Sequence, residues 1–401
     1  MSLDLQFDFL SSHQDKNVVV KKVDSDNEYD VLEPLIDKAF SYNHTNTFFD
    51  RLPKIYTKEN GSIKNQLALS ADGQYRASAG LFYNEMVIAG NQLKICGIGN
   101  VFVSEEYRHK GYMKSIMKNA VSELIENDTD MAFLGGNRQR YEYFSFEPCG
   151  YKYNIDFLTR NEKHFIGNRE NIKLEISPIT KNDKYLKEIK KINEARPAFI
   201  KRDFSPFYDI IRSWDAKIYK ATDSGKLAGY FFERQNGEYV HEIGYTDKKY
   251  IPGIVNAALN MSPDGKIEID CPSYDKNLLG FLSEHGEYLC ICPVEQFSVF
   301  NYKKTVSSFL NLKSETSFIP DGKFSFEING IKRKEKFEII SENNKISVID
   351  LDDKQKCDIV LNHTDAMRFF FSIHSEIRDG ISDNVKSWLP LPLFIYSTDL
   401  V

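Results

Sequence analysis

The segment 104–126, SEEYRHKGYMKSIMKNAVSELIE, constrains the fold of this chain more than any other because it joins a charged turn directly to an amphipathic helix. Apolar residues recur along it at intervals of three and four; they are Met113, Ile116, Met117, Ala120, Val121, Leu124 and Ile125. This spacing gives a helix one apolar stripe, which another layer of structure must cover. We therefore predict a helix after the turn that packs on a β-sheet.

The turn itself places two cations where the helix begins. Arg108 and Lys110 lie beside Gly111 at this point. A helix N-terminus has unpaired N–H donors and the positive end of the helix dipole, so two cations there cost free energy unless an anion binds. Backbone N–H groups from Arg108 to Met113 would form a nest for that anion, and Gly111 lets the chain approach it closely. A pyrophosphate fits this turn, although an isolated R-x-x-G is more often a solvated basic turn.

The elements around the turn predict one α/β unit over residues 17–160. Before the turn come a strand from residue 17, helical segments at 26–40 and 48–56, and three strands in NQLALSADG, QYRASAGLFYNEMVIAG and NQLKICGIGNVFVSEE. After the helix come a buried strand in MAFLGG, a short helix in RQRYEYF and a closing strand in EPCGYKYNIDFL. We assign residues 1–160 to this first domain.

Two further units follow. Residues 161–296 repeat the order of helices, strand meander and helix, which indicates an internal duplication, but no R-x-x-G turn follows HEIGYTD. Residues 297–401 mix helices with strands and end in WLPLPLFIYSTDLV. Prolines in an apolar tail disfavour both a helix and a central strand, so we expect the tail to run extended over another surface.

Composition argues against several classes of protein. A chain of 401 residues predicts two to three domains, and a net charge of −6 without a basic stripe argues against a nucleic-acid partner. The six cysteines form no CxxC pair, which fits reduced thiols and no metal site. No apolar run approaches the roughly 18 residues of a membrane span, and the first residues lack the basic start and apolar core of a signal peptide. We expect a cytoplasmic protein without a membrane partner.

The order of elements in the first unit, together with its turn, resembles the GNAT superfamily of acetyl-CoA-dependent N-acyltransferases. That family's turn is Arg/Gln-x-x-Gly-x-Gly/Ala, and Met113 departs from it at the last position. The resemblance implies that acetyl-CoA binds along the turn, whose residues are Arg108, His109, Lys110, Gly111, Tyr112 and Met113. It also implies that the backbone of the preceding strand contacts the pantetheine; these residues are Val101, Phe102 and Val103. Their N–H groups would stabilise an oxyanion if the strand splays from its neighbour at a bulge.

A second motif supports this resemblance. RYEYFSFEP is similar to the family segment Tyr-x-x-x-Gly-Phe, with Tyr141 at the tyrosine position and Ser145 replacing the glycine. The resemblance implies that Tyr141 lies beside the thioester sulfur and protonates the departing thiolate. Without that context, Tyr141 would be one of 22 tyrosines, most of which simply pack.

The whole chain resembles the Eis (enhanced intracellular survival) acetyltransferases. Those proteins join an active GNAT unit, a degenerate GNAT-like unit and a unit similar to sterol carrier proteins. The fold class is therefore expected to be α/β (α+β), with two tandem mixed-sheet units and a C-terminal sterol-carrier-like α+β domain. The resemblance implies that the tail brings the terminal carboxylate of Val401 into the active site, although a terminal residue ordinarily frays. It also implies a hexamer built as a dimer of trimers, and it makes Asp399 a candidate to hold a second substrate ammonium.

These features predict an N-acetyltransferase that moves an acetyl group directly from acetyl-CoA to a primary amine, aminoglycoside-like or polyamine-like. The amine arrives as an ammonium and must lose a proton, which the Val401 carboxylate would accept. The chain has no G-x-S-x-G elbow that would favour a covalent intermediate. Two alternatives stay open: a non-catalytic protein that binds acyl-CoA or an apolar ligand, and a protein lysine acetyltransferase.

Overall fold

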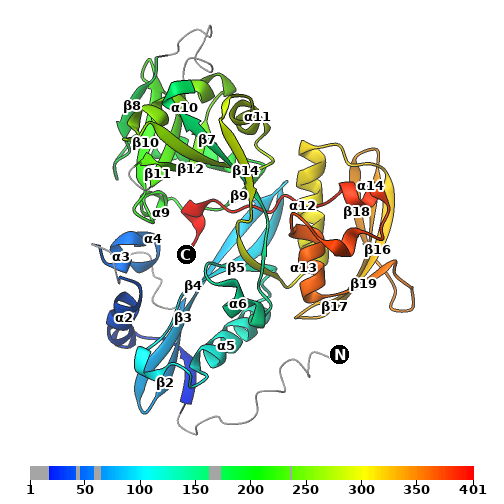
Figure 1. The fold of residues 1–401 in the computed structure, drawn as a ribbon. Helices are drawn as coiled ribbons and strands as arrows, with labels where there is room; N and C mark the ends of the chain where they lie inside the picture. The colour runs from blue at the N-terminus through cyan, green and yellow to red at the C-terminus, as the bar shows by residue number, and fades with distance from the viewer. Residues whose placement is uncertain (1–17, 42–45, 58–64, 162–172, 235–236) are drawn as a thin grey trace.

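The computed structural model describes residues 18–41, 46–57, 65–161, 173–234 and 237–401, which form three β-sheets covered by helices (Figure 1). The first sheet runs in the order β1-β2-β3-β4-β5-β15-β6, with β9 paired to β3. Its strands are β1 Val18–Lys22, β2 Gln66–Ala71, β3 Gln74–Ile88, β4 Asn91–Val103, β5 Met131–Leu134, β6 Glu147–Cys149, β9 Ala198–Ile200 and β15 Glu295–Val299. Its helices are α2 Asp26–Phe40, α3 Phe48–Arg51, α4 Pro53–Tyr56, α5 Tyr112–Glu126 and α6 Arg138–Tyr141.

The predicted amphipathic helix is α5. Its buried residues are Tyr112, Ile116, Met117, Ala120, Val121 and Leu124, which pack against β2, β3 and β4. Met113 and Ile125, at the margins of the stripe, are only half-buried. The helix therefore covers one face of the first sheet, as the periodicity predicted.

The second sheet runs in the order β14-β7-β13-β12-β11-β10-β8. Its strands are β7 Lys152–Leu158, β8 Glu175–Pro178, β10 Lys217–Asp223, β11 Lys226–Arg234, β12 Tyr239–Tyr245, β13 Lys266–Cys271 and β14 Tyr288–Cys292. Its helices are α8 Leu186–Glu194, α9 Phe207–Ile211, α10 Ile251–Met261 and α11 Lys276–His285.

The first two sheets exchange strands, which the sequence did not predict. The expected closing strand in EPCGYKYNIDFL is broken at Gly150, where φ is +70°. β6 stays in the first sheet, whereas β7 pairs with β13 and β14 of the second. In return β15 inserts between β5 and β6. The boundaries at 160/161 and 296/297 therefore describe the order of the chain, while the sheets interlock across them.

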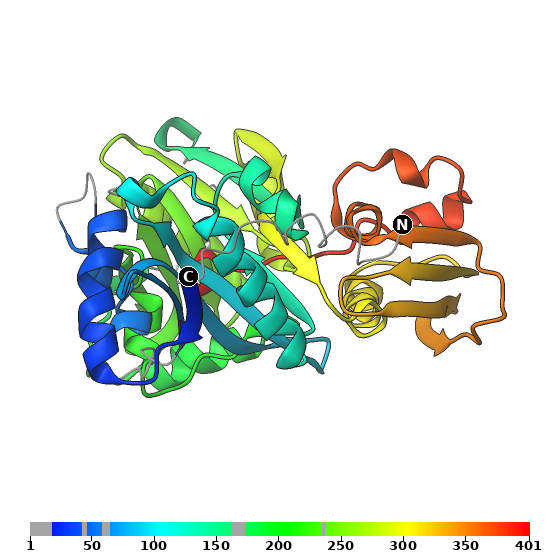
Figure 2. The same ribbon diagram turned by 90° about the horizontal axis from the view of Figure 1, so that it is seen from below.

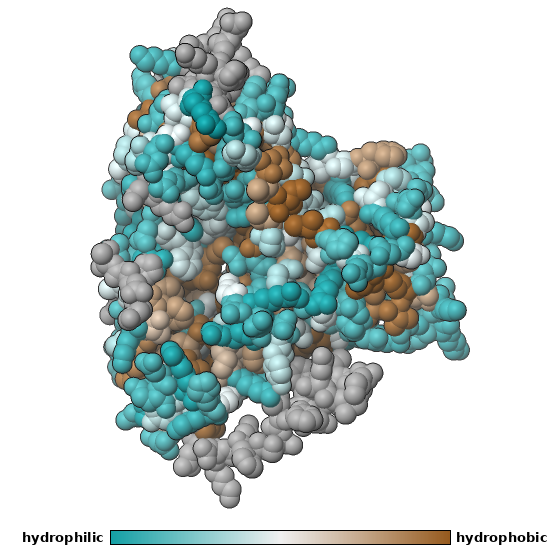
Figure 3. Space-filling model, viewed as in Figure 1, coloured by the Kyte–Doolittle hydropathy of each residue, from teal (hydrophilic) through white to brown (hydrophobic). Residues whose placement is uncertain are grey.

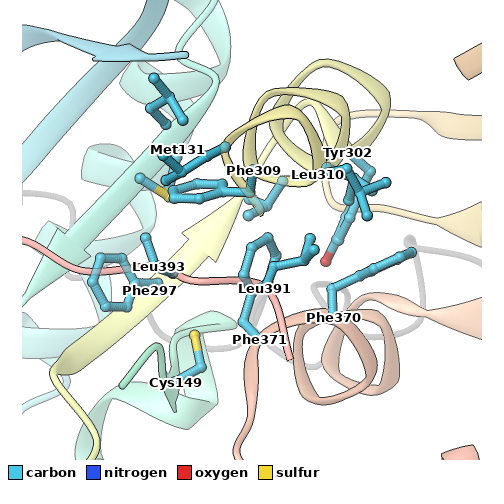
Figure 4. Packing of buried hydrophobic residues seen from close by; sticks show 14 of the residues in the cluster. Met131, Cys149, Phe297, Tyr302, Phe309, Leu310, Phe370, Phe371, Leu391 and Leu393 are labelled. Atoms are coloured by element: carbon cyan, nitrogen blue, oxygen red, sulfur yellow. The ribbon is translucent and has the colours of Figure 1, made fainter. Parts of the chain in front are cut away.

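The third unit consists of a four-stranded sheet in the order β18-β17-β16-β19 and three helices. Its elements are α12 Tyr302–Thr316, β16 Gly322–Asn329, β17 Lys334–Glu342, β18 Lys345–Asp350, β19 Ile359–Asn362, α13 His363–Phe371 and α14 Asp383–Ser387. Figure 4 shows how its helices meet the first sheet. Phe309 of α12 and Phe371 of α13 share one cluster with Met131 and Phe297 of the first sheet, and Leu391 of the tail lies beside Phe371. One core thus joins the third unit to the first.

The C-terminal tail leaves the third unit and runs between the other two (Figures 1 and 2). It is extended, as its prolines predicted, apart from a 3-10 turn at Ser397–Asp399. Residues 391 and 393–396 are buried, and the carbonyl oxygen of Leu393 accepts a hydrogen bond from the Tyr151 N–H at 3.0 Å. The tail therefore belongs to the core rather than to the surface.

Two further observations concern the described residues only. None of their helices is both long and apolar enough to cross a membrane. Within the same residues, no group of three or more His, Cys, Asp and Glu side chains is arranged to hold a metal ion.

Candidate functional site

The site begins where β4 separates from β5. The two strands pair in parallel from Ile95–Met131 to Gly97–Phe133, but β4 continues to Val103. The pairing of β4 with β3 shifts register beside Asn100, whose φ is +43°. The buried Asn100 amide donates to Gln66 Oε1 at 2.7 Å, which holds this bulge in place. The sequence predicted a splay at a bulge as the condition for an oxyanion site at 101–103, and this splay exists.

A cleft of about 970 Å³ opens beside the splayed end of β4, and we name it the α5 cleft. Its lining residues are Ala39, Phe40, Val101, Phe102, Val103, Tyr107, Arg108, His109, Gly111, Tyr112, Met113, Lys114, Gln139, Arg140, Tyr143 and Phe144. The charged side chains among them, Arg108, Lys114 and Arg140, are all basic. The cleft therefore suits an anionic ligand.

The turn at the mouth of this cleft has the geometry of an anion nest. His109 and Gly111 both have positive φ, +66° and +80°. Gly111 caps α5 without a side-chain hydrogen bond, and no acidic residue lies in the first turn of the helix. The positive end of α5 thus faces the cleft without a carboxylate to neutralise it.

Lys110 is placed differently from the other predicted turn residues. Its ammonium lies 4.5 Å from the centre of the Tyr107 ring and does not line the α5 cleft. The sequence missed Lys114 and Arg140, which line it instead. Both follow from elements that were predicted, α5 and α6, but only the fold shows that they face one cleft.

Tyr141 is buried, with 6% of its surface exposed, and its ring packs against the chain just after β5. A Cβ atom on Gly136 would lie 2.8 Å from Cε2 of this ring, so the glycine makes room for it. Burial raises the pKa of the Tyr141 hydroxyl, which keeps it protonated. Its neighbours Arg140, Tyr143 and Phe144 line the α5 cleft, whereas Tyr141 is not among the lining residues.

A second, smaller cleft lies on the tail side of β4, and we name it the tail cleft. Its volume is about 220 Å³. Its lining residues are Lys54, Ile55, Asn65, Phe82, Tyr83, Asn84, Ile95, Phe133, Ile200, Lys201, Arg202, Asp203, Pro206, Ile210, Asp399 and Val401. It therefore brings together residues of the first unit, the second unit and the end of the tail.

Val401 lies directly against β4. A Cβ atom on Gly97 would lie 2.5 Å from Val401 Cγ2, and one on Gly99 would lie 3.1 Å from the terminal carboxyl carbon. The two glycines thus leave space for the end of the chain at the point where β4 leaves β5. Fraying, the ordinary expectation for a terminal residue, does not occur here.

Side chains from both other units hold the tail in this position. Lys54 Nζ donates to the carbonyl oxygens of Thr398 at 2.7 Å and Leu400 at 2.6 Å. Trp214 Nε1 donates to the same Leu400 oxygen at 2.9 Å. Burial lowers the pKa of Lys54 to about 7. No motif in the sequence predicted that Lys54 and Trp214 bind the tail.

A buried ionic network anchors the 3-10 turn of the tail. Arg202 forms two hydrogen bonds to Glu242, at 3.0 and 2.8 Å, and two to Asp399, at 2.8 and 2.9 Å. Glu242 also accepts from Arg196 at 2.9 Å and from the Thr398 hydroxyl at 2.6 Å. Burial alone would raise the pKa of Glu242, but Arg202 and Arg196 hold it well below its ordinary value. Both Asp399 oxygens are therefore already engaged.

The structure adds one carboxyl group that the sequence did not single out. Glu295 Oε2 would lie 3.5 Å from a Cβ atom on Gly135, at the end of β5 and next to the glycine that contacts Tyr141. Burial raises the pKa of Glu295 to about 7. A partly buried carboxyl group with a raised pKa thus lies at the end of β5.

Comparison with known proteins agrees with this geometry. Residues 20–153 match the family of acetyltransferase (GNAT) domains. A search of curated protein sequences gave no match. The predicted fold class, a mixed α/β chain with several sheets, is confirmed by solved structures of similar fold.

Three of these structures cover most of the chain. A GCN5-related N-acetyltransferase from Anabaena variabilis aligns with a TM-score of 0.65 and 14% identity over 94% of this chain and 96% of that one. A conserved protein of Enterococcus faecalis V583 is described as a probable N-acyltransferase. It aligns with a TM-score of 0.64 and 15% identity over 94% of this chain and 97% of that one. Eis1 from Mycobacterium abscessus aligns with a TM-score of 0.56 and 13% identity over 88% of this chain and 90% of that one. At these identities the likeness concerns the fold alone.

Proposed function

We propose that this chain is an acetyl-CoA-dependent N-acetyltransferase of the Eis type, acting on a primary amine. The observation that carries the proposal is the separation of β4 from β5 after Gly97, with a basic cleft on one side and the end of the tail on the other. An acyl-CoA lying in this gap would expose its thioester to an acceptor in the tail cleft. The match of residues 20–153 to acetyltransferase domains supports acyl transfer as the reaction class.

In this proposal the pyrophosphate of acetyl-CoA binds the turn at 108–113. Arg108 and Arg140 supply charge, and the N–H groups at the start of α5 supply donors. The pantetheine follows the free side of β4, where the backbone of 101–103 is available to it. Met113 replaces a small residue of the family motif, but the donors are backbone groups and do not depend on its side chain.

The transfer itself is direct. The terminal carboxylate of Val401, with an intrinsic pKa of about 3.3 to 3.7, accepts a proton from the ammonium, and the free amine attacks the thioester carbonyl. The C–S bond breaks as the tetrahedral intermediate collapses, and Tyr141 donates its proton to the CoA thiolate. The nitrogen loses its second proton to become a neutral amide; this proton returns to Tyr141, and the Val401 carboxyl releases the first proton to solvent. N–H groups of 101–103 stabilise the intermediate oxyanion. Asp399 remains a candidate for contact with the acceptor, although Arg202 already occupies both of its oxygens.

The same proposal gives the other units supporting roles. We assign residues 1–160 to catalysis, 161–296 to a degenerate GNAT-like unit that walls the tail cleft, and 297–401 to a sterol-carrier-like unit that delivers the tail. Apolar side chains gather over the edge strand β14 (Figure 3), where Tyr288, Leu289 and Ile291 are 63%, 44% and 46% exposed. This edge is our candidate for subunit contact in the hexamer that the Eis resemblance implies.

The alternative of a non-catalytic protein that binds acyl-CoA and, in its third unit, an apolar ligand would be favoured by an apolar cavity in that unit. Its interior is instead packed with aromatic side chains; they include Phe309, Phe326, Phe337, Phe369 and Phe370. A pocket found on this unit is lined by charged residues such as Lys303, Arg333 and Glu335. We therefore favour the enzyme.

The test is release of CoA. The chain is incubated with acetyl-CoA and a panel of monoamines, polyamines, aminoglycosides and lysine peptides, and the acetylated product is identified by mass. Turnover with lysine peptides alone would indicate a protein lysine acetyltransferase. Failure of every amine to release CoA would refute the proposed function.

Arg108→Ala is expected to weaken acetyl-CoA binding by roughly 10- to 150-fold, since one charge-assisted contact to pyrophosphate contributes about 1.5 to 3 kcal/mol. Lys110→Ala is the matched control, with a smaller expected loss because its ammonium lies over Tyr107 outside the cleft. Isothermal titration of acetyl-CoA measures both, with one equivalent expected per chain. Equal losses in the two variants, or two binding sites, would contradict this assignment.

A further inference from the structure

We propose that the acceptor bound in the tail cleft is a compact monoamine, with one ammonium group on a partly apolar body, and not a polycation. This inference rests on the proposed function and narrows its substrate. It departs from the aminoglycosides and polyamines that the family resemblance implies.

The first argument is size. The tail cleft measures about 220 Å³, against about 970 Å³ for the α5 cleft. Sites for drug-sized ligands usually measure roughly 300 to 1,000 Å³. A linked-ring aminoglycoside exceeds this space, whereas an arylalkylamine fits it.

The second argument is charge. Three of the lining residues are basic, Lys54, Lys201 and Arg202. Arg202 is balanced by Glu242 and Asp399, and burial lowers the pKa of Lys54 to about 7. Of the acidic groups among the described lining residues, Asp399 is bound on both oxygens by Arg202. This leaves the Val401 carboxylate inside the cleft and Asp203 on its exposed rim.

A single ammonium therefore finds one carboxylate at the place where the proposed chemistry requires a base. A second ammonium inside the cleft would find no unpaired carboxylate among the described lining residues there and would lie near the basic side chains of Lys54 and Lys201. Glu85, a nearby acid, is not available to a second ammonium either, because Lys201 already pairs with it.

The third argument is the apolar wall next to Val401. It consists of Ile55, Phe82, Ile95, Phe133, Ile200, Pro206 and Ile210. Phe133 and the Val401 side chain both approach Gly97, so this wall extends to the point where the strands separate. An apolar body gains free energy by leaving water against such a surface, whereas a polyhydroxylated or polyammonium body does not.

The experiment compares kcat/KM for phenethylamine, spermidine and kanamycin by the rate of CoA release. We expect the value for phenethylamine to exceed each of the others by at least tenfold. Spermidine or kanamycin turning over as well as phenethylamine would overturn the proposal.

A pair of charge variants tests the electrostatic argument. Lys201→Glu should raise the spermidine-to-phenethylamine ratio of kcat/KM by roughly two- to fivefold, as expected for a partly exposed charge. Lys226→Glu makes the same change of net charge at the exposed first residue of β11, outside the cleft, and should leave the ratio unchanged. An unchanged ratio in Lys201→Glu would also overturn the proposal.

The failure of the proposed function is distinguished by binding. If no amine releases CoA, phenethylamine and spermidine are titrated calorimetrically into the chain saturated with CoA. Binding of phenethylamine alone would support the monoamine site even without turnover. Binding of spermidine alone, or of neither amine, would refute it.

Discussion

Extending the chain beyond Val401 is expected to lower kcat by about 10² to 10⁴-fold, the usual cost of losing a general base. Added residues replace the terminal carboxylate beside Gly99 with a neutral peptide group and move the charge away from the site. Acetyl-CoA affinity should not change, because the turn at 108–113 is untouched. CoA release and calorimetric titration on a C-terminally tagged protein measure the two quantities.

Three controls sharpen this test. The same tag at the N-terminus should leave turnover unchanged. Cleavage of the C-terminal tag back to a free Val401 should restore turnover. Val401→Ala should keep most activity because it retains the carboxylate. Equal turnover of the tagged and free proteins would remove the tail carboxylate as the base. Glu295 would then be the next candidate, since it lies beside Gly135 with a pKa raised to about 7, and Glu295→Gln would test it.

Glu242→Gln is expected to lower the free energy of unfolding by about 3 to 5 kcal/mol, the cost of breaking a buried ion pair by removing one partner. Glu242 is fully buried and serves both Arg196 and Arg202, so its loss leaves two buried guanidinium groups undercompensated. The variant should also lose turnover, because the same carboxylate holds Thr398 of the tail.

The matched control is Glu268→Gln, which removes a carboxylate paired with Lys266 at half-exposed positions. Such a pair contributes only about 0 to 1 kcal/mol. Denaturant unfolding followed by tryptophan fluorescence compares the two variants. If Glu242→Gln destabilises no more than Glu268→Gln, the network does not stabilise the fold as we argue.

The sequence predicted those parts of the site that depend on local pattern. The apolar stripe of α5 and the glycine at its start are properties of adjacent residues; the stripe is buried as predicted, and Gly111 adopts a positive φ at the first turn. The tail was predicted to be extended because proline acts locally. Gly97 and Gly99, two residues apart in β4, are a local signal of close approach by another part of the chain, but we did not interpret them in this way from the sequence.

The rest of the site depends on residues that are far apart in the chain. Lys54 bonds to Thr398 and Leu400, which lie 344 and 346 positions further along the chain. Arg202 bonds to Asp399, which lies 197 positions further along. Each of these side chains resembles an ordinary surface charge until the fold brings its partner close. The strand exchange was missed for the same reason, since one break at Gly150 decides which sheet receives β7.

That exchange has a consequence for biosynthesis. The first sheet cannot be completed until β15, at residues 295–299, has been made, because this strand fills the place between β5 and β6. Until then β7, although synthesised early, lacks both of its neighbours, β13 and β14. The emerging polypeptide therefore presents two unfinished sheets with open hydrogen-bonding edges over more than a hundred residues of translation, a state that chaperones commonly protect. For this chain, a fragment that closes both sheets must reach at least residue 299.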